Sequence, residues 1–203
     1  MWRLFKQPNI KSLERKQLRR SPTNPLYLLV VVVAALVHGF AAQAQTKADN
    51  RSVIRVLPPP VAEMRDMIRA AVYSGKIEDL KSALDWNELK PDFGFAPTDD
   101  PITALAAASS DGKGLEILAV LAEILEMQPA ALPLGKDLEN NLIYVWPYLA
   151  ETPIESLTAA EEVDLYRLVS GAKVAEMREK KRWTWWRLVI GADGTWQSFK
   201  KPD

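Results

Sequence analysis

The sequence contains no cysteine and only one histidine, His38, among its 203 residues. Without cysteine the chain has no disulfide bond, no thiol nucleophile and no lipoprotein attachment site. His38 lies within the first 44 residues, so a product cleaved after Ala44 lacks histidine as well. Ser-His-Asp catalysis and ordinary zinc binding are then excluded, because both need imidazole or thiolate groups. Carboxylate chemistry, a Ser-Lys pair or no catalysis at all remain.

The first 44 residues have the anatomy of a secretory signal peptide. Residues 1–24 carry seven Lys/Arg against one Glu, and an uncharged apolar run follows over 26–37. Ala42-Gln43-Ala44 then places small residues where a signal peptidase cleaves. We therefore expect export of residues 45–203 to the periplasm. An uncleaved inner-membrane anchor is the alternative, because a spanning helix needs about 20 apolar residues.

Charge is distributed unevenly, although 26 basic and 26 acidic residues balance overall. The leader has an excess of six bases, so residues 45–203 have an excess of six acids. Affinity for nucleic acid rests on neutralising phosphates, so an acidic domain argues against a nucleic-acid partner. We expect no metal and no cofactor, and contact with a membrane only through an uncleaved N-terminal segment.

Residues 45–59 are expected to be a linker, and residues 60–203 a single globular domain. Apolar residues at helical spacing predict one helix from residue 61 to Gly75, a second helix after Gly75, and a third over 115–127. Asp100 before a proline is typical of a helix start, and Thr158 with Glu161 of a capping box. Residues 128–157 stay undecided between strand and helix.

The C-terminal part predicts a β-hairpin, because residues 183–190 and 195–199 are rich in β-formers and flank a Gly-Ala-Asp-Gly turn. The predicted fold class is α+β, mainly α, with helical hairpins closed by this two-stranded hairpin after a signal peptide or anchor. If the turn between the two strands has two or four residues, four side chains face the helices: Trp186, Leu188, Ile190 and Phe199. The outer side then receives Trp185, Arg187 and Trp196. A three-residue turn would reverse the faces of the second strand.

Three stretches carry a resemblance to a known family. They are Tyr144-Val145-Trp146-Pro147-Tyr148-Leu149-Ala150-Glu151, the segment from Leu157 to Val169, and Trp186 to Trp196. The chain resembles, over about residues 100–200, exported proteins without known activity from rhizobial-type Gram-negative bacteria. The resemblance implies a periplasmic setting and carries over no functional residue.

Candidate catalytic or metal-binding groups all have simpler explanations. Two acid pairs, Asp99-Asp100 and Glu161-Glu162, are candidates for acid-base catalysis, which needs two carboxyls facing one substrate. Helix capping explains Asp100 and Glu161 better. Asp92 with the acids at 99 and 100 lacks the alternation of a calcium loop. Ser110 and Lys113 have Ser-x-x-Lys spacing but no companion motifs.

A basic stretch over residues 178–182 precedes three tryptophans within residues 183–186. Cations beside aromatic rings suit anionic glycans, lipid headgroups or an acidic protein. A solvated helix end followed by a core strand is the alternative. Our hypothesis is a non-catalytic periplasmic protein that binds an envelope protein or glycan through Trp185, Arg187 and Trp196. A carboxylate-dependent enzyme acting on envelope glycan and a membrane-anchored structural protein are the rivals.

Overall fold

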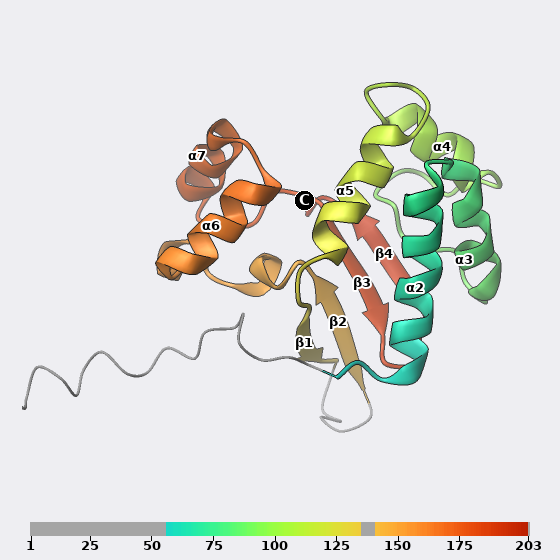
Figure 1. Cartoon of the computed structure of the whole chain (residues 1–203), viewed down its shortest axis with the longest axis horizontal. Coiled ribbons are helices and arrows are strands. Elements are labelled where there is room, and N and C mark those ends of the chain that lie inside the picture. The colour runs from blue at the N-terminus through green and yellow to red at the C-terminus, as the bar shows by residue number, and fades with distance from the viewer. Residues whose placement is uncertain (1–55, 135–140, 203) are drawn as a thin grey trace, which may run out of the picture. The chain divides into compact units, whose positions relative to one another are not determined.

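A four-stranded antiparallel sheet with helices packed around it makes this an α+β fold (Figure 1). The computed structural model describes residues 56–134 and 141–202, which belong to one compact unit, Ala48–Asp203. The predicted leader (1–44) and most of the predicted linker (45–59) lie outside the described residues. Within the described ranges, no helix has the length and apolarity needed to cross a bilayer.

The elements follow one another along the chain as α2 (Pro59–Ser74), η1 (Ile77–Leu80), α3 (Lys81–Trp86), α4 (Pro101–Ala108), α5 (Leu115–Leu125), β1 (Ala130–Pro133), β2 (Leu142–Trp146), η2 (Tyr148–Glu151), η3 (Ile154–Ser156), α6 (Ala159–Leu168), α7 (Gly171–Lys180), β3 (Arg187–Gly191) and β4 (Trp196–Lys200).

Local sequence signals define several helix ends, and the predicted stop at Gly75 and caps at Asp100 and Thr158 are confirmed. The helix expected beyond Gly75 is divided into η1 and α3, and the one expected over 115–127 ends at Leu125. α2 ends before Gly75, whose φ of 68° is a left-handed conformation that glycine adopts without steric cost. Asp100 caps α4, because its carboxylate accepts a hydrogen bond from the Thr103 N–H at 3.0 Å. Thr158 and Glu161 form the predicted capping box of α6. Each of these signals lies within four residues of the helix end that it sets.

The segment 128–157, undecided from the sequence, supplies half of the sheet. Its strands β1 and β2 pair with each other, and β2 pairs with β3. The expected two-stranded hairpin is therefore corrected to the β3–β4 half of a four-stranded sheet. An isolated hairpin is marginal in water. β2 adds Tyr144 and Trp146 to the same apolar core as β3, which explains why the larger sheet forms.

The strand expected over 183–190 is also shorter than predicted and begins only at Arg187. Trp183 is 5% exposed and belongs to a second apolar cluster rather than to the core beneath the sheet. The chain bends at Trp185 before it enters β3. Side-chain alternation therefore does not extend to Trp185 and Trp186, and both are half-buried.

The β3–β4 turn corrects the predicted position of Trp196. Gly191 and Thr195 close a three-residue turn, with the Gly191 N–H donating to the Thr195 carbonyl at 2.8 Å. This turn pairs Ile190 with Trp196, and a β-bulge then pairs Leu188 with Phe199. Turn and bulge together bring the second strand's two aromatic side chains to the inner face. Trp196 is 1% exposed, so its assignment to the outer face was wrong, whereas the burial of Leu188, Ile190 and Phe199 is confirmed.

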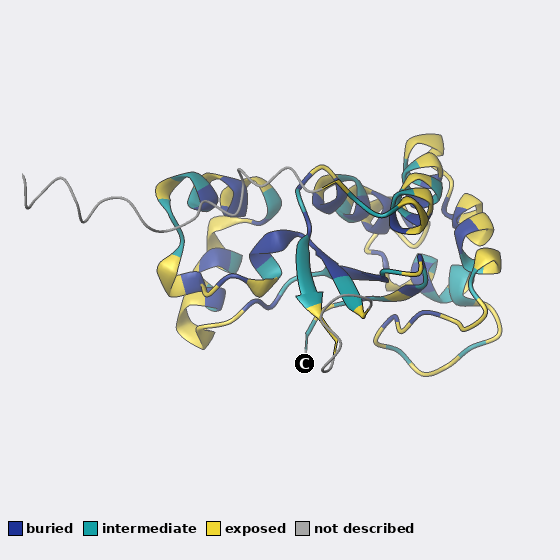
Figure 2. Cartoon of the chain, turned by 90° about the horizontal axis from the view of Figure 1, so that it is seen from below, coloured by how far each residue is buried: buried dark blue, intermediate teal, exposed yellow. Residues whose placement is uncertain are grey.

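Two apolar clusters stabilise the fold. Burial is greatest along β2 and β3, whereas β1 is at most half-buried and the outer sides of the helices are exposed (Figure 2). The main cluster joins the inner face of the sheet to α2 and α5, and its largest fully buried side chains include Met64, Ile68, Leu80, Leu105, Leu121, Trp146, Trp196 and Phe199. The second cluster lies among η2, η3, α6 and α7 and contains Tyr148, Leu149, Ile154, Leu165, Val174, Met177 and Trp183. Trp186 packs at the edge of the main cluster.

Candidate functional site

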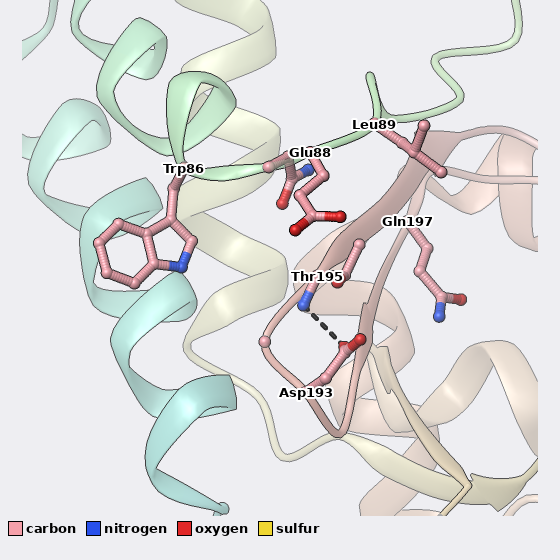
Figure 3. Close-up of a pocket in the computed structure, with 8 residues that line it drawn as sticks. Trp86, Glu88, Leu89, Asp193, Thr195 and Gln197 are labelled. Carbon is pink, nitrogen blue, oxygen red and sulfur yellow. Dashed lines mark hydrogen bonds between the residues drawn. The ribbon is translucent and has the colours of Figure 1, made fainter.

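An open pocket of about 500 Å³ lies between the end of α3 and the β3–β4 turn (Figure 3). One wall follows α3 and the other belongs to the hairpin. The residues that line it are Trp86, Asn87, Glu88, Leu89, Asp193, Gly194, Thr195 and Gln197.

Asn87 fastens the first wall to the hairpin. Its side-chain amide donates to the Trp196 carbonyl at 2.8 Å, and its side-chain oxygen accepts from the Trp196 N–H at 3.0 Å. This pair of bonds satisfies the backbone groups of Trp196 as a neighbouring strand would. Asn87 therefore sets the position of the pocket wall relative to β4.

The loop after Asn87 continues along the outer edge of β4. The Asp92 N–H donates to the Gln197 carbonyl, and the Phe199 N–H donates to the Asp92 carbonyl, both at 2.9 Å. The Asp92 carboxylate also pairs with the Lys200 ammonium at 2.6 Å. The hydrogen bond from the Lys200 ammonium, followed by the one from the Gly94 N–H, holds the pKa of the Asp92 carboxyl below its usual range. The loop thus covers the sheet edge and makes the wall part of the fold.

Gly194 fixes the opposite wall against α2. Its φ of 88° is left-handed, and a Cβ added there would lie 2.8 Å from the Pro60 carbonyl oxygen. Only glycine meets both demands without displacing the backbone. The Asp193 carboxylate accepts from the Thr195 N–H at 2.9 Å and completes the turn (Figure 3).

Trp86 and Leu89 give the pocket an apolar surface that faces solvent. Their exposed fractions are 64% and 76%, high for such large apolar side chains. No aromatic partner within the described residues stacks on Trp86. Exposed apolar surface at a concave site is typical of a binding surface.

The remaining lining side chains are polar or acidic. Glu88 and Asp193 contribute carboxylates, Thr195 a hydroxyl and Gln197 an amide. No Lys, Arg or His lines this pocket. The pocket therefore offers hydrogen-bond acceptors, hydroxyl and amide donors, and negative charge beside an indole ring.

Sequence reasoning did not identify this pocket, although one signal for it was present. The helical pattern after Gly75 places Ile77 and Leu80 on the buried side. At about 100° per residue through α3, Trp86 lies about 120° from Leu80 and therefore outside the buried side. A tryptophan on the polar side of an amphipathic helix indicates a role other than core packing. Its partners on the hairpin are 107 or more positions away, and no sequence pattern relates them.

The three predicted binding residues do not form one surface. Trp196 is buried in the main cluster. Arg187 is paired with Glu151, its Nη1 lying 3.0 Å from the Glu151 Oε1. Its buried Nε has no hydrogen-bond partner among the described residues. Trp185 is half-buried and lies against the ammonium groups of Lys173 and Lys201.

The acidic candidates are separated and individually engaged. Asp100 caps α4, Asp99 pairs with Lys90 at 3.4 Å, and Glu161 belongs to the capping box of α6. Glu162 pairs with Arg178 at 2.6 Å. The described part of the chain contains no group of three His, Asp or Glu side chains arranged to hold a metal ion.

The Ser-x-x-Lys candidate forms the start of α5 instead. The Asp111 carboxylate accepts from the Ser109 hydroxyl at 2.7 Å and from the Lys113 N–H at 2.6 Å. These bonds, with the Glu116 N–H, keep the pKa of Asp111 well below its usual range. The Ser110 N–H donates to the Glu116 carboxylate at 2.7 Å. The polar groups of this turn are thus used to cap the helix.

Comparison with known protein families, curated proteins and solved structures found no match to this chain.

Proposed function

We propose that the domain is a non-catalytic binding module of the cell envelope, which takes a neutral polyhydroxylated ligand, such as a glycan segment, in the pocket beside Trp86. One observation carries the proposal. An indole that is 64% exposed stands beside five polar side chains in a pocket without a cation.

The lining chemistry favours sugar hydroxyls. An indole face is a large apolar surface that suits the C–H face of a pyranose ring. Glu88 and Asp193 accept hydrogen bonds, whereas Thr195 and Gln197 both donate and accept. A sugar hydroxyl also donates and accepts, so a polyhydroxylated ligand can form hydrogen bonds with all of these polar side chains. Two carboxylates without a cation disfavour phosphates and uronic acids.

The envelope setting rests on the sequence. The basic, apolar and small-residue order of residues 1–44 favours export, and the acidic surplus after residue 44 disfavours nucleic acid. A periplasmic domain, released or anchored to the inner membrane, meets envelope glycans and proteins directly.

The rival function is a carboxylate-dependent glycan hydrolase, and one observation favours it. Glu88 and Asp193 line the same pocket. However, both residues are exposed to solvent, whereas the general acid of such an enzyme is held in an apolar pocket. The Asp193 carboxylate is also bonded to the Thr195 N–H. Binding without catalysis therefore fits the pocket better.

Calorimetric titration of the full-length protein with soluble, uncharged N-acetylglucosamine oligomers tests the proposal. We expect saturable binding that Trp86→Ala weakens at least about tenfold, equivalent to about 1.4 kcal/mol. Tyr166→Ala is the matched control, because Tyr166 is 53% exposed on α6 and outside the pocket. It should bind like the wild type.

Two results would contradict the proposal. Equal binding by the wild type and Trp86→Ala would remove the pocket from the function. Release of shortened oligomers by the wild type, abolished in Glu88→Gln, would establish the hydrolase instead.

A further inference from the structure

Two adjacent tryptophans before β3 share one ammonium group. The Lys201 Nζ lies 5.0 Å from the ring centroid of Trp185 and 4.9 Å from that of Trp186. The Lys173 Nζ lies 5.6 Å from the Trp185 ring as well. All three distances are within the range of a cation–π interaction. This pair of indoles thus already attracts cations from two separate segments of the chain.

The indoles are held in place by the fold. Trp186 stacks on Phe199 with centroids 4.7 Å apart and planes 15° from parallel. The Trp183 Nε1–H donates to the Trp186 carbonyl at 3.3 Å, and Trp183 itself is buried. A site whose walls are fixed before the ligand arrives loses little conformational entropy on binding.

The surrounding charges favour a cation at the position of the Lys201 ammonium. Lys173 is paired with Glu176, its Nζ lying 2.5 Å from the Glu176 Oε2, and the same carboxylate also pairs with the Lys180 ammonium at 2.9 Å. Glu116 is near enough to Lys201 for the ammonium to help lower the pKa of that carboxyl, after the larger effect of the Ser110 hydrogen bonds. The two indole faces and the Glu116 carboxylate therefore all attract positive charge.

Lys201 is weakly held in this position. It follows the last residue of β4 and is exposed. Within the described residues its ammonium forms no hydrogen bond or ion pair, and the two ring contacts are its direct interactions. A ligand cation that makes the same contacts can displace it without breaking the fold.

We propose that Trp185 and Trp186 form a binding site for an alkylammonium ligand, and that Lys201 occupies this site as an internal competitor. The site is separate from the pocket at Trp86 and does not depend on the function proposed for that pocket. A quaternary ammonium headgroup and a lysine side chain of a partner share this chemistry.

Titration of ¹⁵N-labelled full-length protein with tetramethylammonium chloride, followed by NMR at the indole N–H groups, tests the site. The signals of Trp185 and Trp186 are assigned with the variants Trp185→Phe and Trp186→Phe. We expect shifts at these two indoles in the wild type and, in Lys201→Gln, an apparent Kd about 3- to 10-fold lower, the factor given by a cation–π contact of moderate strength. Lys113→Gln is the matched control, because Lys113 is an exposed lysine outside the cluster and should leave the Kd unchanged.

The outcomes are distinct. Tighter binding of tetramethylammonium than of butylammonium supports the site and identifies a quaternary headgroup, whereas the reverse order supports it and identifies a lysine-type ligand. Equal affinities of the wild type and Lys201→Gln overturn the proposal. Shifts that sodium chloride reproduces, or that spread equally over the other indoles, overturn it too. In Trp185→Leu/Lys201→Gln the shift of the remaining Trp186 indole should shrink while the thermal unfolding midpoint stays close to that of the wild type, and an undiminished Trp186 shift overturns the proposal.

Discussion

Two tryptophans next to Asn87 have opposite environments: Trp86 is its neighbour in the sequence, and Trp196 is its hydrogen-bond partner in the fold. Trp86 precedes Asn87 in the chain and is 64% exposed. Trp196, whose carbonyl accepts a hydrogen bond from the Asn87 amide and whose N–H donates one to the Asn87 side-chain oxygen, is 1% exposed. One indole is part of the pocket wall and the other is part of the core beneath it. The fold thus uses tryptophan in two ways within one region: as buried volume that stabilises the hairpin, and as free surface that is available to a ligand.

The largest expected effect on stability comes from removing the buried ring, that of Trp196. Trp196→Ala should lower the free energy of unfolding by about 3–5 kcal/mol, because a large aromatic side chain leaves a cavity in the main cluster. Chemical denaturation measures it. The structure gives the same direction for Trp186→Ala but a smaller effect, because Trp186 is half-buried at the edge of the cluster. A Trp196→Ala variant as stable as the wild type would mean that the turn and bulge do not place this ring inside.

Asn87→Ala tests the connection between the two regions. The substitution leaves the N–H and carbonyl of Trp196 without partners, so we expect a loss of about 1–3 kcal/mol in denaturation experiments. Ligand binding at the pocket should weaken as well, because Asn87 positions the wall. Asn141→Ala is a control outside this region, since its amide bonds to the Leu134 carbonyl at an exposed site. It should change stability far less.

Lowering the pH should destabilise the loop around Asp92, next to the pocket, before it affects the main apolar cluster. The pKa of Asp92 is lowered in the folded protein, first by the Lys200 hydrogen bond and then by the Gly94 N–H. A lowered folded-state pKa stabilises the fold above the ordinary value of 3.8, and this stabilisation is lost as the pH falls through the folded-state value. The backbone N–H signal of Gly94, which donates to the Asp92 carboxylate, should therefore move below about pH 4 while the indole signal of Trp196 stays constant. Asp92→Asn should remove this pH dependence, and equal movement of both signals would contradict the account.

The smallest expected effect on stability comes from substituting Trp86, the exposed residue of the pocket wall. Trp86→Ala should change the free energy of unfolding by no more than about 0.5 kcal/mol, because the side chain is mostly solvated. Denaturation beside Trp196→Ala gives the direct contrast. A loss of several kcal/mol from Trp86→Ala would show that the ring contributes to packing, and its exposure would no longer indicate a binding role.

The sequence predicted those features whose causes are local. The caps at Asp100 and Thr158 and the stop at Gly75 each depend on a few neighbouring residues, and the structure contains all three. The burial of Leu188 and Ile190 followed from alternation along β3, whereas Phe199 is buried because the β-bulge offsets the three-residue turn. The α+β class was predicted for the same reason.

Features that depend on distant residues were missed. Nothing near Trp196 in the sequence shows that a three-residue turn and a bulge both act on β4. β1 is Ala-Ala-Leu-Pro, which alternates too little to be read as a strand without its partner β2. The pocket joins residues 86–89 to residues 193–197, and only the fold brings these segments together. Of the predicted binding residues, only Trp185 remains part of a proposed site.

The most direct test of the two-site account is one NMR experiment on the indole N–H groups of the seven tryptophans in the full chain. Uncharged N-acetylglucosamine oligomers should shift the signal of Trp86 and leave those of Trp185 and Trp186 in place, and tetramethylammonium should do the reverse. If the oligomers leave Trp86 unmoved, or if both ligands shift the same indoles, the assignment of two separate aromatic sites is contradicted.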